Sequence, residues 1–197
     1  LVKKGFAGRI LCTRGTADAC QYLLADSAHI QEQDAEYLNY KTVRGALSHG
    51  PSLNGKPIGP RKYEQFRKML KQGRNQINRD VVTDLMARYR LQAVEPLYTA
   101  ADAEQALGHV DGVPYRESFV IGQNLTCTFY EAGHILGSAI SILRHASNGI
   151  VRTVAYTGDI GRFDKPILRN PCLDFEVQDR DIDLLIMEST YGDRDHE

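Results

Sequence analysis

Apolar runs of strand length follow one another closely in the second half of the chain, and this pattern most restricts the folds available to it. ESFVIGQNLTCTFY (117–130) holds two such runs around Gly-Gln-Asn, and AISILRHASNGIVRTVAYTG (139–158) holds two more around Asn148-Gly149. An Asn-Gly pair between apolar runs is a strong signal for a tight β-hairpin. IDLLIME (182–188) ends on a carboxylate and is nearly continuous in apolar residues, which predicts a strand buried on both faces.

The first half of the chain alternates strand-like and helix-like segments. GRILCT (8–13) has the alternation of a strand, and Thr16 is a suitable N-cap for a helix through ADACQYLLA (17–25). A second helical stretch is predicted over residues 26–41. VEPLYT (94–99) is predicted as a short strand whose last residue caps the helix that follows it. Together with the later strands, this order indicates an α/β fold.

A basic segment separates these two parts of the pattern. Residues 45–60 contain four glycines and three prolines, which predicts a long exposed loop. Two amphipathic helices are predicted next, at about 61–72 and 80–91, with basic outer faces. Residues 56–90 hold ten Lys or Arg against three acids, a local balance of 10 − 3 = +7, whereas residues 159–197 hold five against eleven, a balance of 5 − 11 = −6.

The basic helices have two interpretations that the sequence alone leaves open. Their cations could follow a nucleic-acid backbone, because Lys and Arg at phosphates provide most sequence-independent affinity. They could equally be the solvated face of ordinary surface helices. The candidate nucleic-acid contacts are Arg61, Lys62, Arg67, Lys68, Lys71 and Arg74.

Composition excludes several other classes of protein. With 42% apolar and 25% charged residues, the chain has the composition of a globular domain, or of part of one, and nothing in it predicts disorder. No apolar run is long enough for a membrane span, so no membrane partner is expected. The four cysteines form no CxxC pair, so neither a thiolate zinc site nor a disulfide framework is indicated, and a cytoplasmic location is expected.

Three side chains that could carry chemistry follow apolar strands. His134 lies between Gly133 and Gly137, Asp159 lies in YTGDIGR, and Glu188 ends IDLLIME. Glycines beside a histidine permit a tight turn and close backbone approach, and a short carboxylate can bridge two cations. Taken singly, His134 is more often a hydrogen-bonded structural residue, and an Asp beside Gly is more often a turn residue. Three such groups in order favour a site.

Four collinear segments resemble the β-CASP group of metallo-β-lactamase-fold nucleases. AGHILGSA (132–139), YTGDIGR (156–162) with KPIL and NP after it, and DLLIMESTYGDR (183–194) occur in the group's order and spacing. The opening, LVKKGFAGRILCT followed by LLADSAHIQEQDAEYLN, resembles the stretch directly after the group's HxHxDH metal motif. The resemblance covers nearly the whole chain and is weakest over roughly residues 45–92.

The resemblance implies roles for the three strand-end groups. His134 matches a ligand of one zinc, Asp159 matches the aspartate that bridges two zincs, and Glu188 matches an acidic residue that assists phosphate chemistry beside the metals. It implies a two-zinc hydrolase that cleaves phosphodiester bonds, with RNA as the expected substrate and DNA as the alternative. A homodimer is one expectation for the oligomeric state.

The resemblance also implies the architecture. The fold class is α/β, part of a metallo-β-lactamase αββα sandwich with mixed sheets. Residues 1–180 are expected to form a partial metallo-β-lactamase domain, in which roughly residues 45–92 are a loop and basic helical insertion. Residues 181–197 are expected to form the final strand leading towards a β-CASP cap domain that is mostly absent.

One departure from the group's pattern concerns the chemistry itself. No HxHxDH motif occurs in the chain, and a zinc site needs about four donors per ion. We therefore expect this chain alone neither to hold two zincs nor to cleave its substrate. A non-catalytic RNA-binding or scaffold relative with a degenerate metal site is the alternative, while the ESTYG segment disfavours a hydrolase of thioesters or lactams.

Overall fold

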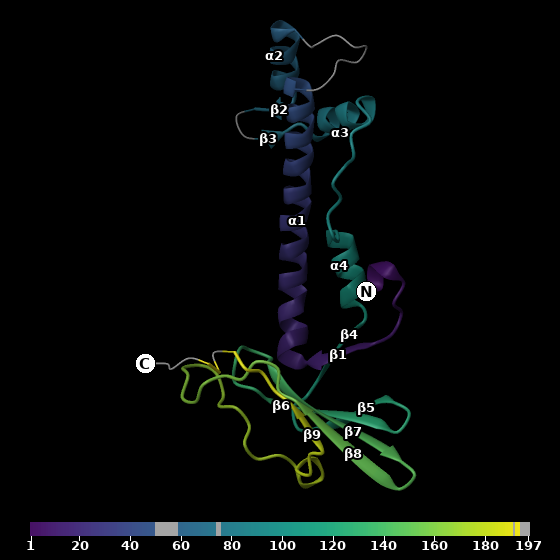
Figure 1. Cartoon of the computed structure of the whole chain (residues 1–197), viewed down its shortest axis with the longest axis vertical. Coiled ribbons are helices and arrows are strands. Elements are labelled where there is room, and N and C mark those ends of the chain that lie inside the picture. Colours follow the sequence, from purple (N-terminus) through teal and green to yellow (C-terminus); the bar gives the residue numbers. More distant parts are fainter. Residues whose placement is uncertain (50–58, 74–75, 191, 194–197) are drawn as a thin grey trace. The chain divides into compact units, whose positions relative to one another are not determined.

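A computed structural model describes residues 1–49, 59–73, 76–190 and 192–193 of the chain, coloured along the sequence in Figure 1. The helices are η1 (Val2–Lys4), α1 (Arg14–His49), α2 (Pro60–Met69), α3 (Arg79–Arg88), α4 (Ala100–Leu107) and η2 (Val177–Asp179). The strands are β1 (Ile10–Thr13), β2 (Lys71–Gln72), β3 (Gln76–Ile77), β4 (Val110–Val113), β5 (Ser118–Gly122), β6 (Leu125–Glu131), β7 (Ala139–Ser147), β8 (Ile150–Tyr156) and β9 (Leu184–Ile186). The predicted α/β class is confirmed.

The chain divides into two compact units. A helical unit comprises Leu1–Phe6 and Leu23–Ala106, and a sheet unit comprises Ala7–Tyr22 and Leu107–Glu197. Helix α1 begins in the sheet unit and continues into the helical unit. None of the helices within the described ranges has the length and apolar character that crossing a membrane requires.

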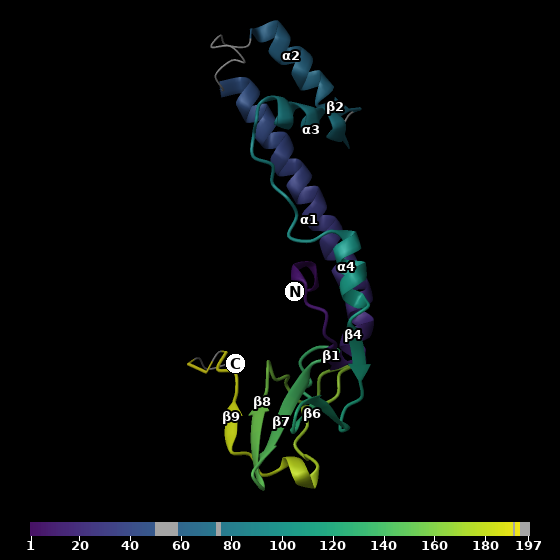
Figure 2. The ribbon, with the colours of Figure 1, turned by 90° about the vertical axis from the view of Figure 1, so that its right-hand side faces the viewer.

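The helical unit closes a core of its own. Helices α2 and α3 lie beside the end of α1, as Figures 1 and 2 show. Each contributes apolar residues at helical spacing, which is why the three elements pack together. The buried residues of this core are Tyr40, Val43, Leu47, Phe66, Leu70, Val82, Leu85 and Met86.

The sheet unit contains a five-stranded mixed sheet in the order β5-β6-β7-β8-β9. Neighbouring strands are antiparallel except β8 and β9, which are parallel. The two apolar runs at 117–130 form the antiparallel strands β5 and β6. The hairpin predicted at Asn148-Gly149 is confirmed: it joins β7 and β8, and both of its residues have positive φ angles. Strands β1 and β4 form a separate parallel pair. The buried centre of the sheet is formed by Tyr130, Ala132, Ile140, Ile142 and Ala155.

Several sequence predictions about the first half are wrong in detail. Residues 14–49 form one continuous helix instead of two stretches, because no proline interrupts them, and residues 45–49 of the predicted loop belong to this helix. Residues 50–58 of that loop lie outside the described residues. The helix cap is Thr13, whose Oγ1 accepts a hydrogen bond from Thr16 N at 3.2 Å, so Thr16 is not the N-cap.

The predicted strand at 94–99 is also absent. The backbone of Val94 bonds to the side chain of Asn39, through Val94 N to Oδ1 at 2.8 Å and from Nδ2 to Val94 O at 2.9 Å. An amide side chain therefore satisfies the polar groups that a neighbouring strand would otherwise pair. The helix cap predicted after this segment is confirmed, because Asp102 N donates to Thr99 Oγ1 at 3.2 Å.

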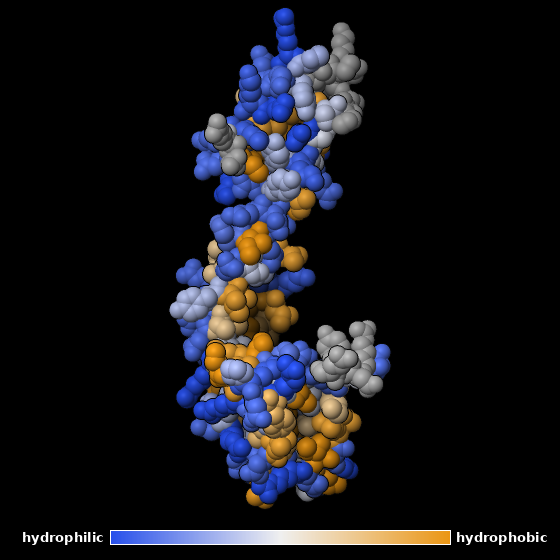
Figure 3. Space-filling view, turned by 90° about the vertical axis from the view of Figure 1, so that its left-hand side faces the viewer, coloured by the Kyte–Doolittle hydropathy of each residue, from blue (hydrophilic) through white to orange (hydrophobic). Residues whose placement is uncertain are grey.

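Strand β9 is shorter and more exposed than predicted. Only Leu184–Ile186 pair with β8, and all three side chains are about half exposed, so burial on both faces is wrong for the described residues. The reason is that β9 lies at the edge of the sheet, where no further strand among the described residues covers it. Figure 3 shows hydrophobic residues, coloured orange, on the surface of the sheet unit.

Candidate active site

The three strand-end groups line one pocket of the sheet unit. The pocket measures about 480 Å³ and is lined by His134, Asp159, Ile160, Arg162, Lys165, Glu188 and Thr190. His134 Nε2 lies 3.9 Å from Asp159 Oδ2, and both side chains remain accessible, at 40% and 68% exposure. Three polar side chains that are well separated along the sequence therefore lie together in the folded sheet unit.

The turn that carries His134 is held by hydroxyl groups on both sides. Ser138 Oγ accepts hydrogen bonds from the backbone N–H of His134 at 3.1 Å and of Ile135 at 3.3 Å. Thr13 Oγ1 donates to the carbonyl of Gly137 at 2.7 Å. Gly137 has φ +84°, and a Cβ there would lie 2.6 Å from Thr16 N, so a side chain at this position is excluded. The predicted tight turn and close backbone approach are therefore present.

The loop that carries Asp159 packs directly on the His134 turn. Gly161 N donates to the carbonyl of Ala132 at 2.8 Å. A Cβ on Gly161 would overlap the carbonyl of Gly133, so only glycine fits there. This backbone contact brings Asp159 and His134 together, since Gly161 follows the one and Gly133 precedes the other.

Glu188 is tied to the same loop. Its Oε1 accepts a hydrogen bond from Ile160 N at 2.6 Å, and its own backbone N–H donates to Thr157 Oγ1 at 3.4 Å. The bond from Ile160 N, followed by one from Thr190, lowers the pKa of the Glu188 carboxyl below its ordinary value. The carboxylate is therefore an acceptor that fixes the Asp159 loop.

Four further residues of the pocket were missed by the sequence prediction, and two of them are charged. Arg162 and Lys165 line it beside the carboxylates, and neither has an ion pair with another described residue. Both come from the segment that continues YTGDIGR, so their nearness to Asp159 in the sequence was the available signal. Two cations next to a candidate metal site can neutralise a phosphate group.

Two side chains of the pocket are of the kind that can bind zinc. His134 Nε2 and Asp159 Oδ2 are donors that zinc accepts, and tetrahedral coordination would place them about 3.4 Å apart, close to their 3.9 Å separation. Within the described ranges, however, no group of three or more His, Cys, Asp or Glu side chains is arranged to hold a metal ion. The donor pair thus fits one side of a zinc ion and requires additional ligands.

The candidate nucleic-acid residues lie in the helical unit. The side chains of the five described members, namely Arg61, Lys62, Arg67, Lys68 and Lys71, are all exposed, and Arg74 lies outside the described residues. Arg67, Lys68 and Lys71 line a pocket of about 530 Å³ together with Glu64 and Gly73. The structure therefore brings three of these cations into one concave surface.

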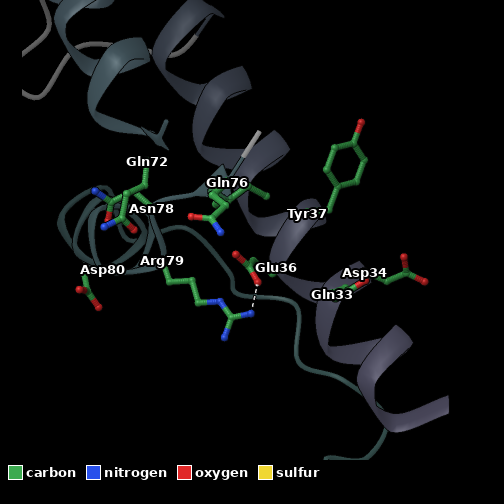
Figure 4. A pocket seen from close by; sticks show the side chains of 10 residues that line it. Gln33, Asp34, Glu36, Tyr37, Gln72, Gln76, Asn78, Arg79 and Asp80 are labelled. Carbon is green, nitrogen blue, oxygen red and sulfur yellow. Dashed lines mark ion pairs between the residues drawn. The ribbon is translucent and has the colours of Figure 1, made fainter. Parts of the chain in front are cut away.

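The helical unit has another cavity, of about 770 Å³, between α1 and the β2–β3–α3 segment (Figure 4). It contains an ion pair in which Arg79 Nη2 lies 2.7 Å from Glu36 Oε2. Four amides and three carboxylates dominate its lining: Gln33, Gln72, Gln76, Asn78, Asp34, Glu36 and Asp80. With one cation against three acids, this cavity is unsuited to a phosphate.

Comparison with known proteins identifies relatives for about half of the chain. It is 38% identical over 102 residues to ribonuclease TTHA0252 of Thermus thermophilus, covering 52% of this chain and 21% of that protein. It is 35% identical over 118 residues to the transcription termination factor FttA of Thermococcus kodakarensis, covering 58% of this chain and 17% of that protein. It is 37% identical over 95 residues to an RNase J-like protein of Methanocaldococcus jannaschii, covering 48% and 21%. No family model matches the chain.

The chain spans about a fifth of the length of these curated relatives. Their similarity agrees with the mixed α/β architecture and implies a metallo-β-lactamase fold. The resemblance, which the sequence predicts over nearly the whole chain, is confirmed over about half of it, and over that half the chain is a relative of β-CASP-like nucleases.

Proposed function

We propose that a longer protein containing this chain hydrolyses phosphodiester bonds of RNA with the help of zinc. One observation carries this proposal: His134, Asp159 and Glu188 share a pocket in a chain whose relatives include proteins named ribonucleases. Four cysteines without disulfide bonds further support a cytoplasmic protein.

The side chains of the pocket have complementary tasks in this proposal. His134 and Asp159 would hold zinc, which when bound supplies Lewis acidity and an activated water near neutral pH. Glu188 keeps the Asp159 loop in position through its bond to Ile160 N. Arg162 and Lys165 orient the phosphate by hydrogen bonds to its oxygens, because charge-assisted bonds to phosphate are strong and directional.

A second candidate is an RNA-binding or scaffold protein that does not cleave. It is favoured by the limited donor set, since the described residues supply only His134 and Asp159 as donors within reach of one ion. The two candidates differ in one result, which is whether RNA is cut when zinc is present.

The test is cleavage of a labelled RNA by the longer protein, with zinc and after chelation. We expect His134→Ala and Asp159→Asn to lower the rate at least about 100-fold, since even outer-shell partners of a metal are worth about 10–100-fold. His145→Ala is the matched control, because His145 is an exposed histidine of β7 outside the pocket. Wild-type cleavage by His134→Ala, or cleavage that persists after complete zinc removal, would overturn the proposal.

A further inference from the structure

The corner where α2 meets β2 concentrates positive charge in a hollow surface. Arg67 and Lys68 come from the last turn of α2, and Lys71 begins β2. With Glu64 and Gly73 they line the pocket of about 530 Å³. We call this surface the α2–β2 corner.

The fold explains why these cations lie together. Phe66 and Leu70 are buried in the helical core, so the residues between and beyond them must face outward. Gly73 has φ +78°, a conformation that favours glycine, and it lies beside the short β2–β3 pairing in which Lys71 is opposite Ile77. The cations therefore stand on elements that the apolar core holds in place.

The charges of the α2–β2 corner are only partly balanced. Glu64 Oε1 lies 3.2 Å from Arg67 Nη1, a pair of exposed side chains one helical turn apart. Lys68 and Lys71 have no ion pair within the described part of the chain. Three cations against one carboxylate leave two positive charges in the pocket.

The α2–β2 corner differs in shape from the solvated face of an ordinary surface helix. Cations on a convex helix point apart, whereas a concave surface directs their fields onto one ligand and raises its local concentration. The cavity in Figure 4 is a useful contrast within the same unit, because it is hollow as well but carries acids in excess. The α2–β2 corner therefore has the concave shape and the positive charge that suit a polyanion.

We propose that the α2–β2 corner binds the sugar–phosphate backbone of RNA and anchors the substrate of the proposed nuclease. This inference rests on the proposed function for the identity of the polyanion. The corner shares no residue with the His134 pocket, and in this proposal it contributes affinity and not bond cleavage. It contacts phosphates, so it binds RNA without preference for base sequence.

The test measures binding of a fluorescent oligouridylate to the 197-residue chain by anisotropy, with a chelator present so that cleavage does not interfere. We expect Lys68→Glu with Lys71→Glu to weaken binding at least about tenfold at moderate salt. The logarithmic salt dependence should flatten by about 1.4, since each lost phosphate contact on a single strand contributes about 0.7. Lys68→Gln with Lys71→Gln should give a smaller loss in the same direction.

The matched control is Lys41→Glu with Arg88→Glu. These two residues are exposed, belong to the helical unit and change the net charge equally, but they do not line the corner. We expect this control to stay within about twofold of the wild type, apart from the weak effect of net charge. Circular dichroism should show the same helicity and thermal unfolding for both double variants.

Equal losses in the two double variants, or unchanged binding by Lys68→Glu with Lys71→Glu, would overturn the inference. Failure of the proposed function gives a different result. In that case the corner variants lose RNA binding as expected, but the wild-type longer protein cuts no RNA. His134→Ala should bind the oligouridylate as the wild type does.

Discussion

The helical unit and the sheet unit differ in how far they bury their apolar residues. Leu85 of the helical core is 2% exposed, whereas Leu185 of β9 is 53% exposed. The core of the helical unit is closed by residues of that unit alone, from α1, α2 and α3. The sheet buries its centre around β6, β7 and β8 but leaves its β9 edge uncovered by described residues.

This difference extends to the two candidate sites. The α2–β2 corner consists of exposed side chains on a closed core, so its charges can change without loss of folding. The His134 pocket depends on backbone contacts between loops, such as Gly161 on Ala132 and Gly133. Substitutions in the α2–β2 corner should therefore change RNA affinity without changing the fold. Substitutions in the loops of the His134 pocket should change the local structure as well as the function.

The largest expected effect is that of Leu85→Ala. Removal of a fully buried leucine leaves a cavity, and we expect a loss of about 2–5 kcal/mol in the free energy of unfolding. Leu185→Ala is the matched substitution on the exposed strand and should cost less than about 1 kcal/mol. Hydrogen exchange can follow each unit by itself. Similar losses in the free energy of unfolding at both positions would show that the two units bury their apolar residues equally.

Gly161→Ala tests the loop contact in the sheet unit. The added Cβ would overlap the Gly133 carbonyl, so the loops must separate, at a cost of about 1–3 kcal/mol or more. Amide resonances near His134 should shift, while those of the helical core stay unchanged. Gly45→Ala is the control, because a Cβ there meets no atom within 4 Å. Unchanged resonances near His134 would contradict the contact.

Tyr130→Phe tests the polar group buried beneath the sheet. Tyr130 OH donates to Oδ2 of the fully buried Asp179 at 2.7 Å, and burial together with this bond raises the pKa of the tyrosine. Without the hydroxyl, the buried carboxylate loses a donor, which should cost about 1–3 kcal/mol in chemical denaturation. Tyr156→Phe is the exposed control on β8. An equal effect of both substitutions would rule out a special role for the buried pair.

Asp183→Asn should have the smallest effect, and that effect depends on pH. The backbone N–H of Thr153 and then Arg152 lower the pKa of the Asp183 carboxyl. Because the folded pKa lies below the unfolded one, the carboxylate stabilises the fold above about pH 3.9, and the effect disappears as the pH falls through the folded pKa. The melting temperature of the variant should be lower at neutral pH and equal in strong acid. A constant difference at all pH values would refute this.

The strands of the sheet could be predicted because their signals are local. Alternation of apolar residues and the Asn148-Gly149 turn are properties of neighbours in sequence, and β5 to β8 follow them. The segment at 94–99 misled the prediction because its partner, Asn39, lies 55 residues away. When a side chain from a helix takes the place of a neighbouring strand, the sequence of the segment shows no periodic pattern that would reveal it.

The three central residues of the candidate site could be predicted from the sequence, but the other residues that line the pocket could not. His134, Asp159 and Glu188 follow strands, and strand order together with the resemblance placed them in one group. Arg162 and Lys165 join the pocket because the Asp159 loop folds back onto the His134 turn through Gly161. That fold-back depends on a contact between backbones, which residue types alone do not encode.

The proposed division between cleavage and anchoring can be measured in one steady-state experiment on the longer protein. We predict that His134→Ala lowers kcat at least about 100-fold with little change in KM, since it removes a group that acts in the transition state. Lys68→Glu with Lys71→Glu should raise KM at least about tenfold, much more than it changes kcat, since it removes binding common to substrate and transition state. If both variants changed kcat and KM in the same proportion, the two regions would not divide these tasks, and the account would be contradicted.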